Sequence, residues 1–251
     1  MRFTPLASSS HGNSYIVNDE KTRILIECGL AFRTLQQKSG FCISSFDGCL
    51  ISHEHKDHSR CVAKVIESGI PVYLSQGTAM SLGLPEPLIA MASEMEAWKQ
   101  FQIGTITVLP FPTYHDTMEP LGFCLKSALD GETVAFAIDT VNCPYSFPDA
   151  QILAVEANYD PEFFRWLNDA IEDDDSIDSI KKMQMRKRCI RTMNTHMSID
   201  KLCECLHRMN LKKCREIWLM HLSDDHSREM EFIRRVQGVV PHQIVVRACG
   251  R

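Results

Sequence analysis

The sequence predicts a layered α/β protein built around one large hydrophobic core. Short apolar runs typical of buried strands, such as Thr22–Cys28 and Thr133–Ile138, alternate with segments whose apolar residues recur at helical spacing. Histidine-rich and acidic loops follow several of these strands, which is where layered α/β proteins gather their ligand sites. With 251 residues, 44% hydrophobic and 24% charged, the chain is an ordinary globular sequence with ample material for a core.

The first half of the chain alternates between the two kinds of element. Apolar or alternating runs bounded by Gly, Pro, Asn or Ser mark its strands, and periodic apolar positions mark its helices. The expected strands are Arg2–Leu6, Ser14–Val17, Thr22–Cys28, Asp47–Ser52, Pro71–Leu74 and Ile103–Leu109. The expected helices are Ala31–Lys38, a helix from Asp57 onward and Gln76–Leu82.

The second half follows the same signals and adds one helix-rich stretch. Asp130-Gly131 is a hairpin turn signal between the first two strands of this half. The expected strands are Leu121–Leu125, Thr133–Ile138, Ile152–Glu156, Glu216–Met220 and His242–Arg247. Helices are expected within Pro161–Arg191, at Ile199–Met209 and at Ser227–Val236, and the region 160–193 is the best candidate for an inserted lobe.

The densest group of metal-ligand side chains follows the strand Asp47–Ser52. Three histidines and one aspartate fall within six residues, at His53, His55, Asp57 and His58. Imidazole and carboxylate together suit zinc, manganese or iron. On a loop, His53 and His55 can converge on one ion while Asp57 and His58 turn toward a second. The pattern therefore predicts a metal site rather than a polar loop with chance histidines.

Five further side chains stand at or just beyond strand ends. His115 follows the strand Ile103–Leu109, and Asp139 follows an apolar strand whose end would otherwise bury a costly carboxylate. For Asp139, bridging a metal competes with a helix-capping role. Glu156, His196 and His221 complete the group.

Composition narrows the class of protein and of partner. The net charge of −5 gives no support to broad, non-specific nucleic-acid binding. The acidic run Glu172–Asp175 and the basic run Lys181–Arg191, with six positive residues, make the charge uneven. No apolar run approaches the roughly 20 residues of a membrane span, and Met1–Leu6 has no signal-peptide core, so we expect a cytoplasmic protein with its eleven cysteines reduced.

These motifs resemble those of the metallo-β-lactamase fold superfamily. The resemblance rests on the run His53–His58, on the opening Leu6–Asn13, and on Glu156–Asp160, Thr195–Ser198 and His221–Ser223. The last three are similar to the phosphodiesterase branch, which includes RNase Z and the WalJ/YycJ-like proteins; phage anti-Pycsar phosphodiesterases are also similar. Glu27 stands where the WalJ/YycJ-type branch usually has aspartate. The resemblance implies a four-layer αββα sandwich, with 1–251 as a single domain and a helical insertion at about 160–193.

The resemblance also implies a dinuclear site with two divalent ions, zinc first and manganese next. The implied ligands of one ion are His53, His55 and His115, those of the other are Asp57, His58 and His221, and Asp139 bridges them. His196 would stay free of metal and donate a proton, oriented by Glu156, while Asp57 accepts the proton of the nucleophile. The implied catalytic residues are Asp57, His196 and Glu156.

The implied activity is hydrolysis of a phosphodiester in a nucleotide or nucleic-acid substrate. Net acidity slightly favours a cyclic mononucleotide, as for the anti-Pycsar enzymes, whereas the basic run Lys181–Arg191 favours a DNA exonuclease of the WalJ/YycJ type. For a cyclic mononucleotide, loops such as Ser8–Asn13 or Asp224–His226 would contact the base, with a homodimer partner as a further source of contacts. Thioester or lactam hydrolysis on the same fold is the less favoured alternative, and a non-catalytic metal-binding module is the least.

Overall fold

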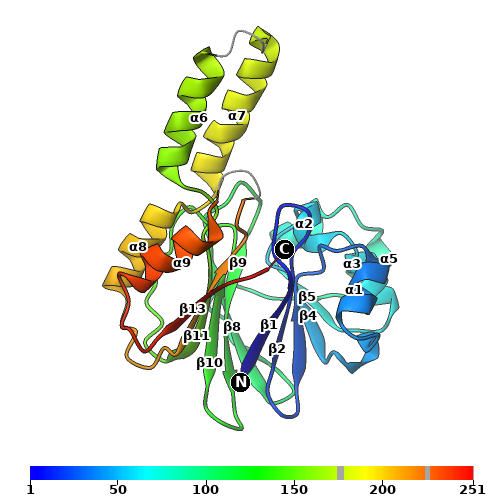
Figure 1. Cartoon of the computed structure of the whole chain (residues 1–251). Coiled ribbons are helices and arrows are strands. Elements are labelled where there is room, and N and C mark those ends of the chain that lie inside the picture. The colour runs from blue at the N-terminus through cyan, green and yellow to red at the C-terminus, as the bar shows by residue number, and fades with distance from the viewer. Residues whose placement is uncertain (174–177, 224–226, 251) are drawn as a thin grey trace.

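Two β-sheets packed face to face form the centre of the protein (Figure 1). The computed structural model describes residues 1–173, 178–223 and 227–250. One sheet has the order β1 (Arg2–Ala7), β2 (Ser14–Asn18), β3 (Arg23–Ile26), β4 (Gly48–Leu50), β5 (Val72–Leu74) and β6 (Ser93–Glu94). The other has the order β13 (Val245–Ala248), β12 (Glu216–Met220), β11 (Ala150–Glu156), β10 (Thr133–Ala137), β9 (Leu121–Ser127), β8 (Ile106–Pro112) and β7 (Phe101–Ile103).

Helices cover the outer face of each sheet, so the molecule has four layers (Figure 1). The helices beside the first sheet are α1 (Phe32–Lys38), α2 (Lys56–Ser59), α3 (Val62–Glu67), α4 (Gln76–Ser81) and α5 (Glu86–Ile89), with a short 3-10 turn at Ile43–Ser45. The helices beside the second sheet are α8 (Ile199–Arg208) and α9 (Glu229–Gln237). This is the αββα arrangement that the sequence predicted.

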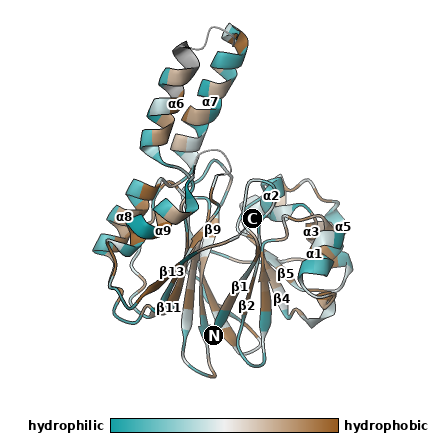
Figure 2. Ribbon diagram, in the orientation of Figure 1, coloured by the Kyte–Doolittle hydropathy of each residue, from teal (hydrophilic) through white to brown (hydrophobic). Residues whose placement is uncertain are grey.

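The strand sequences explain the layering because successive side chains point to opposite faces of a sheet. In β3, Ile24 and Ile26 join the core between the two sheets, whereas Leu25 packs with Val65 in the core under the outer helices. Strands of this kind are buried on both faces and therefore read as continuous apolar runs. Figure 2 shows the hydrophobic residues concentrated in the strands.

The helix-rich stretch after β11 forms a hairpin of α6 (Pro161–Asp173) and α7 (Ser179–Thr195) that projects from the body (Figure 1). At its base, Tyr159 and Ser198 form a parallel β-bridge, which brings the two ends of the hairpin together. A small core of its own, made by Tyr159, Phe164 and Cys189, holds the lower part of the two helices together. The hairpin therefore enters and leaves the body at one point.

Two expected elements differ in the structure. The expected strand Ile103–Leu109 is instead a tight hairpin of β7 and β8, because Gly104 adopts a φ of 53° and turns the chain. The helix expected from Asp57 onward is divided into α2 and α3, because the Cys61 amide bonds to the carbonyl of Cys28 at 3.0 Å.

Two segments singled out in the sequence lie outside the described residues, wholly or in part. They are the candidate base-contact segment 224–226 and residues 174–175 of the acidic run. Along the described ranges, no helix combines the length and the apolar composition needed to cross a lipid bilayer.

Candidate metal centre

The strand directions bring the predicted ligand side chains to one edge of the sandwich. Strands β10, β11 and β12 are parallel, and β8 runs in the same direction because two antiparallel pairings separate it from β10. Their carboxyl ends therefore meet at one edge, where they are followed by His115, Asp139, Glu156 and His221. The loop after β4 brings His53–His58 to the same place from the other sheet.

The first cluster joins three imidazoles to one carboxylate. One potential ligand atom from each of His53, His55, His115 and Asp139 lies within 4.8 Å of all the others. The Asp139 Oδ2 atom is 3.7 Å from Nε2 of His53 and 3.5 Å from Nε2 of His115. These two separations are longer than ordinary hydrogen bonds, and they fit one cation held between the four groups.

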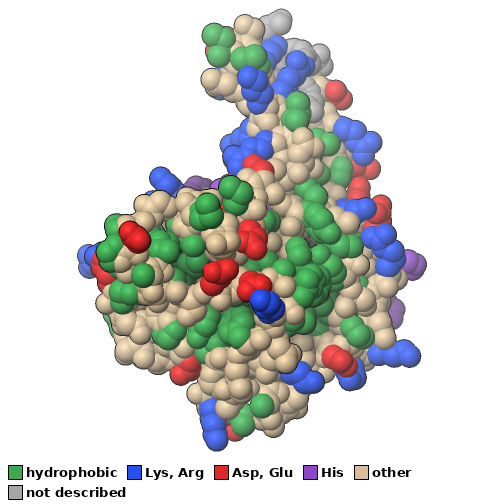
Figure 3. Space-filling model, turned by 180° about the vertical axis from the view of Figure 1, so that it is seen from behind, with side chains coloured by type: hydrophobic (Ala, Val, Ile, Leu, Met, Phe, Trp, Pro, Cys, Tyr) green, Lys and Arg blue, Asp and Glu red, His purple; other side chains and the backbone are tan. Residues whose placement is uncertain are grey.

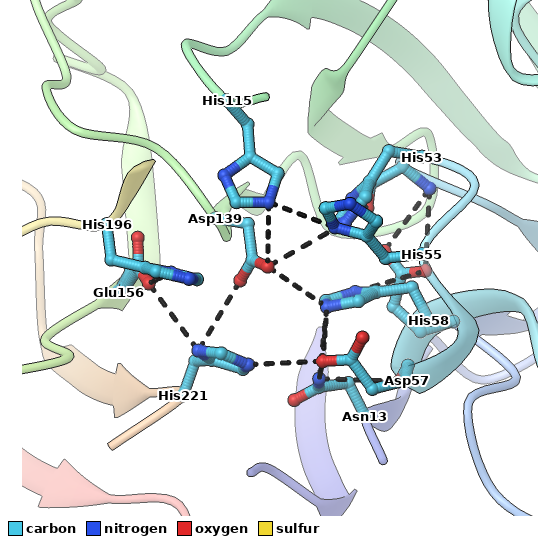
Figure 4. Close-up of polar contacts among 12 residues, drawn as sticks. Asn13, His53, His55, Asp57, His58, His115, Asp139, Glu156, His196 and His221 are labelled. Carbon is cyan, nitrogen blue, oxygen red and sulfur yellow. Dashed lines mark hydrogen bonds and ion pairs between the residues drawn. The ribbon is translucent and has the colours of Figure 1, made fainter. Parts of the chain in front are cut away.

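The second cluster shares Asp139 with the first. One atom from each of Asp57, His58, Asp139 and His221 lies within 4.8 Å of all the others. Oδ2 of Asp57 is 3.3 Å from Nε2 of His58 and 3.4 Å from Nε2 of His221. Figure 4 shows Asp139 between the two groups, with contacts to histidines on both sides. Asp139 thus belongs to both clusters.

Unsatisfied buried atoms in these clusters test whether a metal fits. Among the described residues, His53 Nε2 and Asp139 Oδ1 are buried without a hydrogen-bond partner, and both atoms belong to these clusters. Unpaired buried polar atoms are costly, and coordination of a cation is one way to satisfy them. The donor set of imidazoles and carboxylates suits a divalent transition metal.

In two histidines of the first cluster, His53 and His115, the Nδ1 atom already has a hydrogen-bond partner. Nδ1 of His115 lies 2.7 Å from the carbonyl oxygen of Thr195. Because a carbonyl oxygen only accepts hydrogen bonds, Nδ1 must carry the hydrogen. His53 Nδ1 lies 2.8 Å from Oγ of Ser52. Such contacts fix the ring and the tautomer of metal-binding histidines and leave the second nitrogen as the ligand. At both residues the Nε2 atom faces Asp139, and Nε2 of His115 also lies 3.1 Å from Nδ1 of His55.

The charge balance of the second cluster also favours a cation. Burial opposes protonation of His58, but the carboxylates of Asp139 and Asp57 outweigh it and raise the pKa of this ring well above its usual value. Burial likewise opposes a charged His221, yet neighbouring carboxylates, Asp139 first, raise its pKa to about 10. A divalent ion held by these residues would supply the same positive charge, and its binding would release these protons.

His196 and Glu156 form a pair beside the two clusters. His196 Nδ1 is 2.6 Å from Oε1 of Glu156, and Oε2 of Glu156 accepts from the amides of Thr140 and Met197. Burial of the His196 ring opposes its charged form, but the Glu156 and Asp139 carboxylates raise its pKa. The carboxylate is fully buried, whereas the imidazole keeps 17% of its side-chain surface exposed. The ring is thus oriented and open to a ligand.

The metal-binding loop is fixed by backbone contacts with the chain around Gly29. The backbone amide of Asn13 donates to the carbonyl oxygen of Asp57 at 2.7 Å, and the backbone amide of Cys28 donates to the carbonyl oxygen of His58 at 2.8 Å. A Cβ added at Gly29 would lie 1.6 Å from the Asp57 carbonyl oxygen, so only glycine allows this approach.

Three side chains outside the predicted ligand set contact the ligands. The side-chain amide nitrogen of Asn13 lies 3.1 Å from Nε2 of His58, and the side-chain amide nitrogen of Asn158 lies 2.9 Å from Nδ1 of His221. Oε1 of the fully buried Glu27 accepts from the Ser52 amide, and Oε2 is 3.6 Å from Nδ1 of His58. All three stand at positions that the resemblance had already singled out: Asn13 in the opening Leu6–Asn13, Asn158 in Glu156–Asp160, and Glu27 where related proteins usually have aspartate.

Three residues of the centre have backbone conformations that side chains rarely adopt. The φ angles are 64° at Glu27, 44° at Asp139 and 51° at His221. Left-handed backbone at residues with a Cβ costs of the order of 1–3 kcal/mol each and occurs preferentially at functional sites. The fold accepts this cost where strands end and their side chains must turn toward the centre.

The clusters line a cavity of about 330 Å³. All nine residues predicted from the sequence lie together in this region, and α7 contributes Arg188, Arg191, Thr192 and Thr195 to the cavity wall.

A protein-family model described as "Beta-lactamase superfamily domain" matches residues 22–222. The chain belongs to the β-lactamase superfamily. Within this superfamily it is similar to exodeoxyribonuclease YycJ of Bacillus anthracis, with 25% identity over 66% of this chain and 66% of that protein. It is also similar to exodeoxyribonuclease WalJ of Streptococcus pneumoniae, with 23% identity over 90% of this chain and 83% of that protein.

A solved structure confirms the fold of this superfamily member. The metallo-β-lactamase fold protein YhfI from Bacillus subtilis superimposes with a TM-score of 0.69 at 16% identity, covering 99% of this chain and 97% of YhfI. The chain therefore has the metallo-β-lactamase fold that its motifs predicted.

Proposed function

We propose that this chain is a metal-dependent phosphodiesterase that acts on nucleotide substrates with two divalent ions. The observation that carries the proposal is His196, an imidazole beside both ligand clusters that is held by the buried carboxylate of Glu156. An alkoxide leaving from phosphorus needs a proton, and a charged imidazole at this place can supply one. The names of the two relatives, both exodeoxyribonucleases, support the same class of bond.

In this proposal the two ligand clusters hold one ion each and share one carboxylate. The residues assigned to them are His53, His55 and His115, then Asp57, His58 and His221, with Asp139 in common. Divalent ions held there polarise a phosphoryl oxygen and make water a nucleophile at neutral pH. Five histidines to two carboxylates suit zinc first and manganese next.

The protein groups around the ions have separate tasks. Glu156 keeps the His196 ring charged and correctly oriented, so that the ring can donate to the leaving oxygen. Asp57, held by the Asn13 amide at 3.3 Å, accepts the proton of the attacking water. Hydrolysis of a phosphodiester uses both groups, a base for the attacking water and an acid for the leaving oxygen.

Two substrate classes fit this chemistry, and thioester or lactam hydrolysis fits less well because it makes less use of a charged His196. A cyclic mononucleotide is favoured by the net charge of −5 and by a cavity of about 330 Å³, near the lower end of the range for small-molecule sites. A polynucleotide end is favoured by the two exodeoxyribonuclease relatives.

A turnover comparison tests the proposal. Cyclic CMP, cyclic UMP and end-labelled duplex DNA should be offered to the protein in zinc and in manganese, with nitrocefin and a thioester as controls. We expect at least one phosphodiester to be hydrolysed faster than either control. Hydrolysis of the lactam or the thioester alone would contradict the proposal.

A further inference from the structure

Helix α7 concentrates positive charge that the catalytic proposal does not use. Six of the chain's 27 Lys and Arg residues, and none of its 32 acidic residues, lie in the 17 residues of α7. This concentration stands out because the whole chain has a net charge of −5. Figure 3, which views the molecule from behind, shows Lys and Arg side chains along the projecting hairpin.

One face of α7 forms a continuous polar stripe. Residues three and four positions apart share a helix face. The residues with this spacing, which we call the α7 stripe, are Lys181, Gln184, Arg188, Arg191 and Thr195. At 1.5 Å per residue, the stripe is about 20 Å long. Another face of the helix buries Cys189 against Phe164 of α6.

The inner end of the stripe belongs to the metal centre. Arg188, Arg191 and Thr195 line the cavity, and the Thr195 carbonyl accepts from His115. Nε of Arg191 bonds to Oδ2 of Asp116 at 2.9 Å, which ties the helix to the loop that carries His115. Lys181 and Gln184 continue the same face outside the cavity and are exposed. The stripe thus leads from solvent to the ligand clusters.

We infer that the α7 stripe binds the phosphate backbone of a polynucleotide strand whose end lies in the metal centre. This inference rests on the proposed phosphodiesterase function and selects its substrate class. A cyclic mononucleotide has one phosphate and leaves the outer stripe without a ligand, whereas a strand offers a phosphate at every nucleotide. Cations that follow a strand out of an active site are typical of single-strand binding grooves.

Binding measurements test the stripe independently of catalysis. Fluorescein-labelled single strands of DNA and of RNA, 2 to 16 nucleotides long, are titrated with the protein at several salt concentrations and followed by anisotropy. We expect affinity to increase with strand length until the strand spans the stripe. For Lys181→Gln/Arg188→Gln, the salt slope should fall by about 1.4, and affinity at 0.1 M salt should fall roughly 25-fold, because each lost phosphate contact forgoes about 0.7 of a released counterion.

A matched control removes the same charge from another side of the helix. Lys182→Gln/Arg186→Gln lies off the stripe, and it should change the salt slope by much less than the stripe variant does. Thermal melting of both variants checks that the hairpin remains folded. Equal effects of the two variants would overturn the inference, since binding would then follow net charge alone.

The remaining outcomes separate this inference from the proposed function. Affinity that does not depend on strand length, or binding of anionic phosphatidylserine vesicles without binding of either nucleic acid, would also overturn it. The proposed function is measured by hydrolysis of a small nitrophenyl phosphodiester by the wild-type protein. Hydrolysis of that ester without length-dependent binding would refute strand binding by the α7 stripe but not the phosphodiesterase activity. Length-dependent binding without hydrolysis of the ester would refute the phosphodiesterase activity alone.

Discussion

Nδ1 of His196 lies 2.6 Å from Oε1 of Glu156, and this contact links the end of α7 to the end of β11. The second carboxylate oxygen of Glu156 is held by two backbone amides. The carboxylate therefore cannot rotate away, and the imidazole has one orientation relative to Asp139. This hydrogen bond is shorter than those within the two clusters, where His55 and His115 lie 3.1 Å apart and Asp57 and His221 lie 3.4 Å apart.

Replacing His196 by Ala should leave metal content and fold unchanged but remove most turnover. A general acid contributes roughly 10²–10⁴ in rate. The loss should be much smaller for a nitrophenyl phosphodiester, whose leaving group needs no proton. Steady-state rates on both substrates provide the measurement, with His207→Ala, an exposed histidine on α8, as the matched control. An equal loss on both substrates would show that His196 acts as a ligand or a scaffold instead.

Metal content should depend on which cluster is altered. Wild-type protein prepared with added metal should hold about two ions per chain, as dinuclear hydrolases do. His53→Ala should lose about one ion, whereas Asp139→Ala should lose both because Asp139 belongs to both clusters. Inductively coupled plasma mass spectrometry gives the count. Less than one ion in the supplemented wild type would contradict the dinuclear assignment.

Glu27→Gln should weaken the ion assigned to the second cluster. The Glu27 carboxylate lies 3.6 Å from His58 Nδ1, and groups behind a ligand typically contribute 10- to 100-fold in metal affinity. Competition with a chromogenic chelator measures the change, and Glu94→Gln, an exposed carboxylate remote from the centre, is the control. Unchanged affinity in Glu27→Gln would mean that His58 is positioned by Asn13 and the backbone alone.

Asp19 should make stability depend on acid pH. Partial burial opposes its charged form, but hydrogen bonds from Thr105, Ser127 and two backbone amides lower its pKa to about 2. A lowered pKa means that the carboxylate stabilises the fold above its usual value of 3.8, and that this contribution disappears as pH falls through about 2.

Asp19→Asn should therefore lower the free energy of unfolding at neutral pH by about 1–2 kcal/mol, because solvent screening of this partly exposed carboxylate reduces the roughly 1.5–3 kcal/mol of hydrogen bonds to a charged group. The gap to wild type should narrow as the pH falls from 4 toward 2. Urea titrations across this range measure it, and Glu20→Gln, the exposed neighbour, should stay within about 0.5 kcal/mol of wild type. If the difference in unfolding free energy between wild type and Asp19→Asn stays constant with pH, the effect comes from the packing of the side chain and not from its charge.

The sequence allowed the layers and the ligand positions to be predicted because both depend on local patterns. Apolar runs such as Thr133–Ile138 mark strands, and a carboxylate such as Asp139 at the end of one has few other uses. The turn at Gly104 was missed because the residues on both sides of it continue the alternation of a single strand.

Other features depend on contacts between distant segments, which no local pattern specifies. The division of the helix after the metal loop results from the bond between Cys61 and Cys28. The supporting positions of Asn13 and Glu27 likewise require the first sheet to be packed against the loop that carries His58. The position of α7 beside the centre requires the whole hairpin, whose helices could be predicted but whose direction could not.

The β-bridge between Tyr159 and Ser198 has a consequence for how the protein can evolve as well as for how it folds. Because the chain leaves and re-enters the body at adjacent points, the outer part of the α6–α7 hairpin can lengthen, shrink or be exchanged without shifting the register of any strand. With the roles proposed for the ligand clusters and the α7 stripe, bond cleavage and substrate choice would be encoded in separable stretches of the gene. New specificities are accessible to ordinary insertion and deletion, with no compensating change among the histidines.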